Sequence, residues 1–315
     1  MPRRRHDVAS DPVVPPRPTT IDLHTHTVRS DGVLEPAALV AAAAAVGVRL
    51  LAITDHDDLS AFRELTDDPG GRAIPAGMTL LPGVEINCLT GDVPELWESE
   101  LHILGLGVDP ADDALEATLV RQRDRRRVRF ARTLVRLREL GLPVDDVAAE
   151  LDPTQTASLG RPTVARLLQA KGYVTSVEDG FARYLGRGRP AYVPRDGIGP
   201  VDAIHAIRGA GGLAVLAHFS EAPDRVPIVR ELAETGLGGL EVYYRTFDQA
   251  TVAAVGSVAD ELRLLKTGGS DYHGDTGPYA EAHAQLWVPP EAGEALTTWL
   301  ASSASAPQTG SMSAR

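Results

Sequence analysis

Residues 20–26 read Thr-Ile-Asp-Leu-His-Thr-His, an apolar run of strand character that ends in two histidines, His24 and His26. The same pattern recurs along the chain, because short apolar runs carry or precede His56, His102, His218, His273 and the carboxylate of Glu85. Histidine is the commonest metal ligand, and neutral imidazole together with carboxylate suits divalent transition metals. Such groups at the same end of many strands are typical of a metal site at the mouth of a barrel.

The apolar runs alternate with stretches of helical character. Residues 36–46 are alanine-rich, begin at a proline and are followed by Gly47, which are start and stop signals of a helix. Residues 201–208 and 225–235 also have a helical pattern. Such alternation predicts a parallel sheet, and we count seven strands, at 20–23, 49–54, 79–86, 101–107, 213–217, 239–243 and 262–267. The sequence therefore predicts an α/β fold, a (β/α)7 barrel whose active site lies at the carboxyl ends of the strands, where we expect the histidine patterns to fall.

Residues 111–197 interrupt this alternation of strands and helices. Residues 112–140 are charged and have a helical period, and further helices are expected over 161–171 and about 177–185. We therefore expect a barrel formed by 19–110 and 198–301, and an all-helical insertion at 111–197 that could cap the barrel mouth. The polar termini, 1–18 and 302–315, are expected to be disordered.

Composition narrows the class of protein. The chain has 315 residues, 43% of them hydrophobic, and a single cysteine, Cys88, so it forms no internal disulfide. The sequence has neither the apolar core of a signal peptide nor a stretch apolar enough to span a membrane, and we expect a cytoplasmic protein without a membrane partner. The net charge of -12 argues against a large nucleic-acid footprint, but not against an anionic substrate held by metal ions. Oligomeric state is left open.

The spacing of the candidate ligands favours a site with several metal ions. His24 and His26 are two residues apart, so on a strand both side chains point to the same face, and Asp271 and His273 repeat this spacing. A carboxylate can bridge two ions, and Glu85 and Asp271 are the natural candidates. The remaining histidines, His6, His205 and His283, do not follow the pattern and are expected to be structural or solvated.

These motifs resemble those of the PHP (polymerase and histidinol phosphatase) superfamily. The resemblance covers residues 20–110 and 198–275, and it rests on Asp22-Leu23-His24-Thr25-His26, Ser30-Asp31-Gly32, Thr54-Asp55-His56-Asp57, Gly83-Val84-Glu85, His102, Ala217-His218 and Gly269-Ser270-Asp271-Tyr272-His273. It implies a distorted, TIM-like (β/α)7 barrel that binds two or three divalent ions, with Mn²⁺ first and Fe²⁺ or Zn²⁺ as alternatives.

The resemblance also implies how the ligands are shared among three sites. The first would be His24, His26, Glu85 and Asp271; the second Glu85, His102 and His218; the third Asp31, His56 and His273. Many relatives have a histidine near the position of Asp31, and the alternative role of Asp31 is to cap the turn before Gly32. Asp55 is expected to orient a ligand rather than to bind metal.

Three further stretches are similar to the nucleoside 3′,5′-bisphosphate phosphatases of that superfamily, some of which also act as 5′→3′ exoribonucleases on short RNA. They are residues 160–166, 184–194 and 211–218, and residues 239–244 fit the same group. The chain departs from the group at Thr163, where histidine is common, and at Phe219, where proline is common. Both departures bear on which substrate is accepted.

Arginines in the insertion could bind the phosphates of the substrate. The guanidinium fork suits phosphate, and the candidates are Arg161, Arg166, Arg187 and Arg189. Residues 121–129 contain six arginines, but Asp124 interrupts them, and we interpret this stretch as a solvated, ion-paired helix face.

The sequence thus predicts a metal-dependent phosphoesterase, a phosphoric ester hydrolase, with Glu85, His218 and Asp271 as catalytic residues. The expected substrate is a nucleoside 3′,5′-bisphosphate that loses its 3′-phosphate, or a short 5′-phosphorylated oligoribonucleotide. Two alternatives are a phosphatase that acts on another small monoester such as histidinol phosphate, and a non-catalytic PHP scaffold or polymerase partner stabilised by metal.

Overall fold

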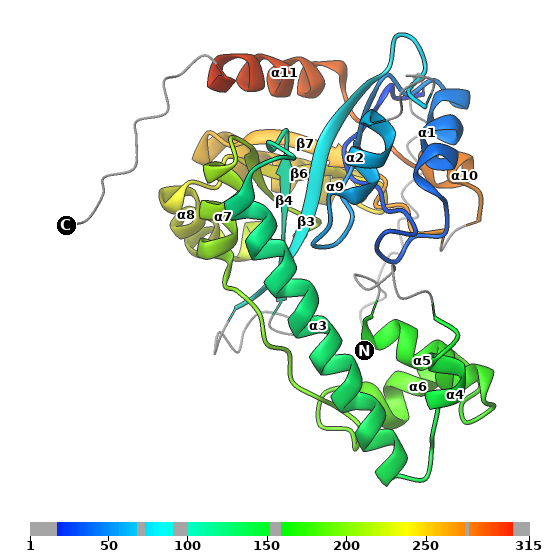
Figure 1. Cartoon of the computed structure of the whole chain (residues 1–315). Coiled ribbons are helices and arrows are strands. Elements are labelled where there is room, and N and C mark those ends of the chain that lie inside the picture. Colours follow the sequence, from blue (N-terminus) through cyan, green and yellow to red (C-terminus); the bar gives the residue numbers. More distant parts are fainter. Residues whose placement is uncertain (1–17, 68–72, 91–99, 152–158, 275–276, 305–315) are drawn as a thin grey trace, which may run out of the picture.

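A seven-stranded sheet forms the centre of the molecule (Figure 1). The structure is a computed structural model that describes residues 18–67, 73–90, 100–151, 159–274 and 277–304. All seven predicted strands are present, as β1 (Ile21–Asp22), β2 (Leu50–Ile53), β3 (Thr79–Leu89), β4 (Glu100–Leu106), β5 (Leu213–Leu216), β6 (Gly239–Tyr244) and β7 (Leu265–Gly269).

The sheet closes on itself as a distorted barrel. The strands pair in chain order from β1 to β7. Between β7 and β1 the ring is completed by backbone hydrogen bonds, in which the Leu23 N–H donates to the Gly268 carbonyl at 3.1 Å and the Asp271 N–H donates to the His24 carbonyl at 2.7 Å. The predicted fold class is confirmed.

The prediction of an all-parallel sheet is wrong for β4, which runs antiparallel to both β3 and β5. Only ten residues separate the end of β3 at Leu89 from the start of β4, and a parallel crossover needs about a dozen or more. His102 consequently lies near the amino end of its strand and not at the carboxyl end. Because β4 is reversed, that amino end shares a rim with the carboxyl ends of the other strands.

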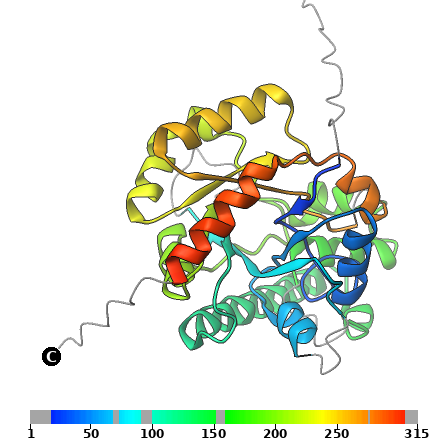
Figure 2. The same cartoon turned by 90° about the horizontal axis from the view of Figure 1, so that it is seen from above.

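Helices surround the barrel and close one of its ends. They are α1 (Pro36–Ala45), α2 (Ser60–Thr66), α7 (Pro200–Gly209), the short 3₁₀ turn η4 (Ala222–Asp224), α8 (Val226–Thr235), α9 (Gln249–Leu262), α10 (Tyr279–His283) and α11 (Pro290–Ala304). Figure 2 shows α11 lying across the barrel. Leu296 of α11 belongs to the same buried cluster as Ile21 and Leu50, so α11 covers the end at which β1 and β2 begin.

The chain between β4 and β5 is helical where the structure describes it. Its elements are α3 (Asp113–Glu139), α4 (Asp145–Ala148), α5 (Arg161–Ala170), α6 (Val177–Gly180) and the π-helical turn η3 (Phe181–Leu185). Leu115 and Leu119 near the start of α3 pack into the barrel core, whereas Leu137 near its end packs into a separate apolar core with α5. α3 therefore extends from the barrel to the smaller helices α4, α5 and α6 and connects the two cores (Figure 1).

Most of both expected tails, residues 1–17 and 305–315, lies outside the described residues. α11 continues to Ala304, past the boundary expected at residue 302. Among the residues that the structure describes, no helix combines the length and the apolar character that crossing a membrane requires.

Candidate metal centre

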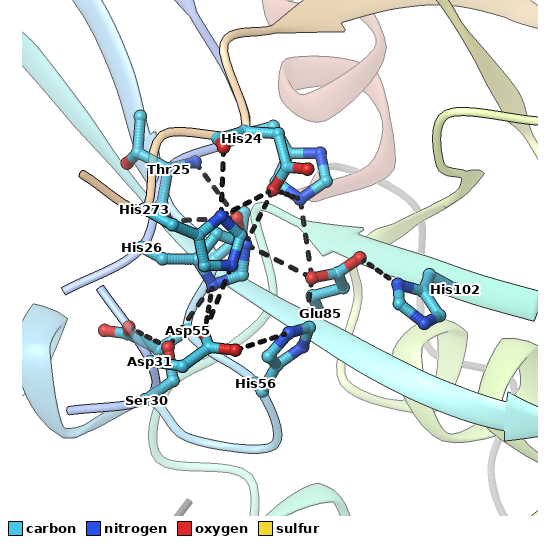
Figure 3. Close-up of polar contacts among 12 residues, drawn as sticks. His24, Thr25, His26, Ser30, Asp31, Asp55, His56, Glu85, His102 and His273 are labelled. Atoms are coloured by element: carbon cyan, nitrogen blue, oxygen red, sulfur yellow. Dashed lines mark hydrogen bonds and ion pairs between the residues drawn. The ribbon is translucent and has the colours of Figure 1, made fainter. Parts of the chain in front are cut away.

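All nine predicted ligands meet on the rim at which the parallel strands end. Figure 3 shows most of them, among them His24, His26 and Glu85. They fall into three groups, and within each group one potential ligand atom from every residue lies within 4.8 Å of the others. The groups are His24, His26, Glu85 and Asp271; Glu85, His102 and His218; and His26, Asp31, His56 and His273. This grouping reproduces the three predicted sets, with His26 added to the third.

The first group has the spacing of donors around a single ion. The Nε2 atom of His24 lies 3.4 Å from Glu85 Oε2 and 3.2 Å from Asp271 Oδ1. The corresponding distances for His26 Nε2 are 3.2 and 3.1 Å. Donors bound at about 2.1 Å in tetrahedral or octahedral geometry are about 3.0 to 3.4 Å apart. The four atoms therefore outline the coordination shell of a small divalent cation.

Glu85 links the first group to the second. Its Oε2 faces His24, His26 and His56, the last at 3.0 Å from Nδ1. Its Oε1 lies 2.8 Å from His102 Nδ1 and 3.2 Å from His218 Nε2. The two oxygens thus face different sets of imidazoles, as expected of a bridging carboxylate. Asp271 belongs to one group only, because its Oδ2 accepts a hydrogen bond from the Tyr244 hydroxyl at 2.9 Å.

The third group is built around Asp31. Its Oδ1 lies 3.1 Å from His273 Nε2, and its Oδ2 lies 3.7 Å from His56 Nε2. The ring of His273 stacks on that of His26, with centroids 4.0 Å apart. Asp31 therefore faces the imidazoles, which favours the ligand role over the capping role also considered for it.

The donor atoms fit a set of divalent ions. Several are buried and have no hydrogen-bond partner among the described residues, namely His24 Nε2, His26 Nε2, Asp31 Oδ1, His56 Nδ1, Glu85 Oε2 and Asp271 Oδ1. Leaving buried polar atoms unpaired is costly, and each such case needs an explanation. Here the unpaired atoms converge on one another, and cations between them would satisfy all of them.

The electrostatics of the first group also favour a cation. Burial by itself would lower the pKa of His24 and His26, but the neighbouring carboxylates outweigh it and raise both values, that of His26 to about 10. Burial would raise the pKa of Glu85 and Asp271, and the surrounding histidines instead hold both well below the usual range. Ionised carboxylates thus face imidazoles that have to lose a proton before they can bind a metal.

The backbone is unusual at three positions on this rim. Asp57, His218 and Asp271 have φ angles of 54°, 33° and 48°, a region that non-glycine residues rarely adopt. Such conformations cluster at functional sites, where the surrounding structure holds them in place. At His218 and Asp271 they set the direction of predicted ligands.

Asp55 belongs to none of the three groups, but it contacts residues that neighbour them. Its carboxylate accepts hydrogen bonds from the backbone N–H and hydroxyl of Thr27, at 2.7 and 2.6 Å, and from the Ser30 hydroxyl at 2.6 Å. The Ser30 hydroxyl in turn lies 3.3 Å from His26 Nδ1. Asp55 therefore fixes the turn that carries Asp31 and orients His26.

Glu241 of β6 is a supporting residue that the sequence did not single out. It is 1% exposed, and its carboxylate contacts His24 Nδ1 at 3.0 Å and accepts the backbone N–H of His218 at 2.7 Å. It thereby leaves His24 Nε2 for the first group and holds the left-handed backbone of His218. The only available signal was its place within residues 239–244, at the end of a strand.

The predicted substrate arginines are not gathered at the metal groups. Arg166, Arg187 and Arg189 are exposed on the insertion. Arg161 lies over the rings of Phe181 and Tyr192, with its Cζ 5.4 and 6.0 Å from their centroids. Arg161 also lines a small pocket that it shares with Arg129.

The prediction of a solvated face at residues 121–129 is only partly right. Arg121 and Arg127 are exposed, but Arg123 and Arg126 are mostly buried. Arg123 donates to the Asp57 carbonyl at 2.6 Å, and Arg126 pairs with the Asp57 carboxylate. The middle of α3 is therefore attached to the residue that follows His56, and the helix period alone could not reveal this partner.

The other described histidines belong to none of the ligand groups, and neither do Thr163 and Phe219, the two departures from the bisphosphate phosphatase pattern. His205 is exposed, and buried His283 lies 3.1 Å through Nε2 from the Thr19 carbonyl, as expected of solvated and structural residues. His6 lies outside the described residues. Thr163 is buried in the first turn of α5, and Phe219 packs against the barrel core.

Several known proteins are similar to this chain in sequence and fold. The model of the PHP domain family matches residues 22–130. The chain is 32% identical over 287 residues to the 5′-3′ exoribonuclease Rnm of Salmonella typhimurium, covering 88% of this chain and 93% of the relative. It is 34% identical over 268 residues to the 3′,5′-nucleoside bisphosphate phosphatase of Chromobacterium violaceum, covering 80% and 87%. A structure from Bifidobacterium adolescentis, classed as a metal-dependent phosphoesterase, superposes with a TM-score of 0.73 at 28% identity, covering 89% and 96%.

This chain has a barrel with imidazoles and carboxylates converging on its rim, and its relatives are named for the cleavage of phosphate esters. Together these findings define a phosphoric ester hydrolase. The similarity to these relatives extends over most of the chain, so the chain can also be assigned to a family. The chain belongs to the PHP family.

Proposed function

We propose that this protein removes the 3′-phosphate of nucleoside 3′,5′-bisphosphates, with divalent ions held by the three ligand groups. The observation that carries the proposal is the pair of ligand groups joined through Glu85, whose two oxygens face different sets of imidazoles. Clustered divalent ions, when bound, would activate water and neutralise the charge of a phosphate. The substrate is suggested by the Chromobacterium relative, which is named for this activity.

Glu85, Asp271 and His218 would have different roles in the reaction. Glu85, buried and ionised, holds the two groups at a fixed separation. Asp271 is oriented by Tyr244, which occupies its second oxygen. His218 is 27% exposed at the mouth, and it is the candidate to pass a proton toward the leaving oxygen of the sugar. Because Glu241 fixes the backbone of His218, this ring stays at the edge of the site.

A second substrate class is a short 5′-phosphorylated oligoribonucleotide, which the Salmonella relative's name as a 5′-3′ exoribonuclease suggests. The reaction is closely related, because in both substrates the bond from the 3′-oxygen to phosphorus is a candidate for cleavage. Among the predicted substrate arginines, Arg161 stays the strongest candidate, because it borders a pocket that includes Arg129.

The test is release of inorganic phosphate from adenosine 3′,5′-bisphosphate by the Mn²⁺-loaded protein. We expect adenosine 5′-monophosphate and phosphate as products, and we expect Glu85→Ala to abolish the reaction. Exposed Glu234→Gln is the matched control and should retain full activity. Full activity of Glu85→Ala would contradict the proposal. So would a wild-type protein that releases no phosphate from any phosphate ester.

A further inference from the structure

Asp22, at the end of β1, is a fully buried carboxylate that belongs to none of the ligand groups. Charged residues are almost never fully buried unless they are paired. The Oδ1 atom of Asp22 accepts the backbone N–H of Ser270 at 2.8 Å and, more weakly, that of His24 at 3.4 Å. Its Oδ2 accepts the hydroxyl of Tyr279 at 2.7 Å. Both oxygens are thus used as acceptors, away from the ligand atoms.

These contacts lie on the seam between β7 and β1, where the barrel closes. β1 has only two residues, so little strand pairing is available to hold the seam. The two strands also approach closely there, because a Cβ added to Gly269 would lie 2.3 Å from the Cβ of His24. His24 and Asp271, both members of the first ligand group, stand on opposite sides of this seam. Its spacing therefore decides how far apart the two ligands are.

Asp22 also stabilises the unusual backbone at Asp271. The φ angle of Asp271 is 48°, and such a conformation persists only where the surrounding structure imposes it. Two consecutive N–H groups, those of Ser270 and Asp271, are fixed by acceptors on the β1 side, which are the Asp22 carboxylate and the His24 carbonyl. The direction of the Asp271 side chain, whose Oδ1 faces His24 Nε2 at 3.2 Å, therefore depends on Asp22.

Tyr279 of α10 supports Asp22 from a buried aromatic cluster. Tyr279 is 2% exposed, and its ring packs edge-on against Tyr272, with centroids 5.3 Å apart. On another side it stacks on His283, whose Nε2 contacts the Thr19 carbonyl just before β1. α10 is only five residues long, so these contacts rather than its own hydrogen bonds hold it in place. The Tyr279 hydroxyl consequently reaches Asp22 from a fixed position.

We propose that Asp22 and Tyr279 are positioning residues of the metal centre, which hold the seam at the spacing at which His24 and Asp271 share one ion. Neither side chain would touch the metal or the substrate. The inference rests on the part of the proposed function that places divalent ions at the ligand groups, and it does not depend on which ester is cleaved. An apolar residue at position 22 would leave the Ser270 N–H and the Tyr279 hydroxyl buried without an acceptor, which is costly.

The first experiment compares the loss of two neighbouring hydroxyls. Mn²⁺ affinity is measured by calorimetric titration for wild type, Tyr279→Phe and Tyr272→Phe. Both changes remove a hydroxyl from the same buried cluster, but the Tyr272 hydroxyl donates to the Gly277 carbonyl at 3.1 Å. Tyr279→Phe should weaken the binding of one ion by about two- to tenfold, the effect of one hydrogen bond, and Tyr272→Phe should keep the wild-type affinity. Wild-type affinity in Tyr279→Phe, or equal losses in both variants, would overturn the proposal.

Asp22→Asn should have the larger effect. The amide keeps the size of the side chain but loses the charge and one acceptor, and we expect Mn²⁺ affinity to fall by about 10- to 100-fold. Thermal melting of the metal-free variant checks its folding, and if Asp22→Asn does not fold, Tyr279→Phe decides alone. Unchanged Mn²⁺ affinity in a folded Asp22→Asn would contradict the inference.

The position of the lost ion distinguishes positioning from a general loss of stability. His102 and His218 of the second group lie on β4 and directly after β5, neither of which adjoins the seam. In crystals of Tyr279→Phe grown at limiting Mn²⁺, the anomalous peak at the first group should therefore fall relative to the peak at the second. An equal fall of both peaks would show that the hydroxyl is merely structural, and would overturn the proposal.

Hydrolysis of adenosine 3′,5′-bisphosphate, measured on the same samples, separates failure of this inference from failure of the proposed function. If the wild type hydrolyses no ester but Mn²⁺ affinity depends on Asp22 and Tyr279, the proposed function fails and this inference stands. If hydrolysis proceeds and Mn²⁺ affinity is the same in all variants, this inference fails alone. A wild-type protein that binds no Mn²⁺ would contradict both.

Discussion

The rim of the barrel and the helical insertion differ in how their functional groups are positioned. On the rim, donors come from strands or from loops next to strands, and supporting carboxylates such as Asp55 and Glu241 are fully buried. In the insertion, Arg123 and Arg126 of α3 contact Asp57, the residue that follows His56. Backbone register thus fixes the rim groups, whereas tertiary docking of α3 positions the arginines. The rim should therefore bind metal independently of how well the insertion packs.

The largest effect on metal binding is expected from Glu85→Gln. Glu85 is the one residue shared by the first two groups, and the substitution removes its charge at nearly constant volume. Changes to residues that only support ligands typically cost 10- to 100-fold in affinity, so we expect a loss of Mn²⁺ affinity of more than about a hundredfold. Calorimetric titration with Mn²⁺ measures it. Near-wild-type affinity would show that Glu85 does not bridge the groups.

The change of Mn²⁺ affinity with pH should be nearly as large as the loss expected for Glu85→Gln. Neighbouring carboxylates raise the pKa of His24 and His26, that of His26 to about 10, so these rings have to release protons when metal binds. Affinity should increase with pH from 6 to 9, by up to about tenfold per unit for each proton displaced. Titrations in buffers of different ionisation enthalpy count the protons. Absence of proton release at pH 7 would contradict this account.

Glu241→Gln should have a smaller effect than Glu85→Gln. The amide keeps the shape of the side chain but loses the charge that fixes His24 Nδ1 and the His218 backbone. We expect Mn²⁺ affinity to fall by about 10- to 100-fold, the usual cost of losing such support. Glu234→Gln, exposed on α8, serves as the control for charge alone. Equal affinities for the two variants would remove Glu241 from the supporting network.

The smallest effect on metal binding is expected from Leu168→Ala in the insertion. Leu168 is fully buried in the apolar core around α5, so the change should cost about 2–5 kcal/mol of unfolding free energy in that region. Mn²⁺ affinity should stay within about twofold, because no ligand group includes an insertion residue. Chemical denaturation and Mn²⁺ titration on the same sample compare the two regions. A parallel loss of affinity would show that the rim depends on the insertion.

The sequence could bring the candidate ligands together on the rim because the patterns that carry them are local. His24 and His26 lie two residues apart, directly after β1, and the Nε2 atoms of both face Glu85 and Asp271. His102 was predicted as a ligand, but its place on the strand was wrong, since the direction of β4 depends on the length of the preceding connection. Glu241 was missed because a lone glutamate at a strand end gives no pattern.

The insertion was less predictable for a physical reason. A helix period shows which residues share a face, but not what that face meets. Arg126 looks like its exposed neighbour Arg127 in the sequence, and only docking of α3 onto Asp57 distinguishes them.

The most direct test of the shared metal centre is an anomalous-scattering map from crystals grown with Mn²⁺ and measured at the manganese absorption edge. The account predicts peaks within the three ligand groups, with Glu85 contacting two of them through different oxygens. Peaks confined to one group, or located away from Glu85, would contradict a centre bridged by this carboxylate.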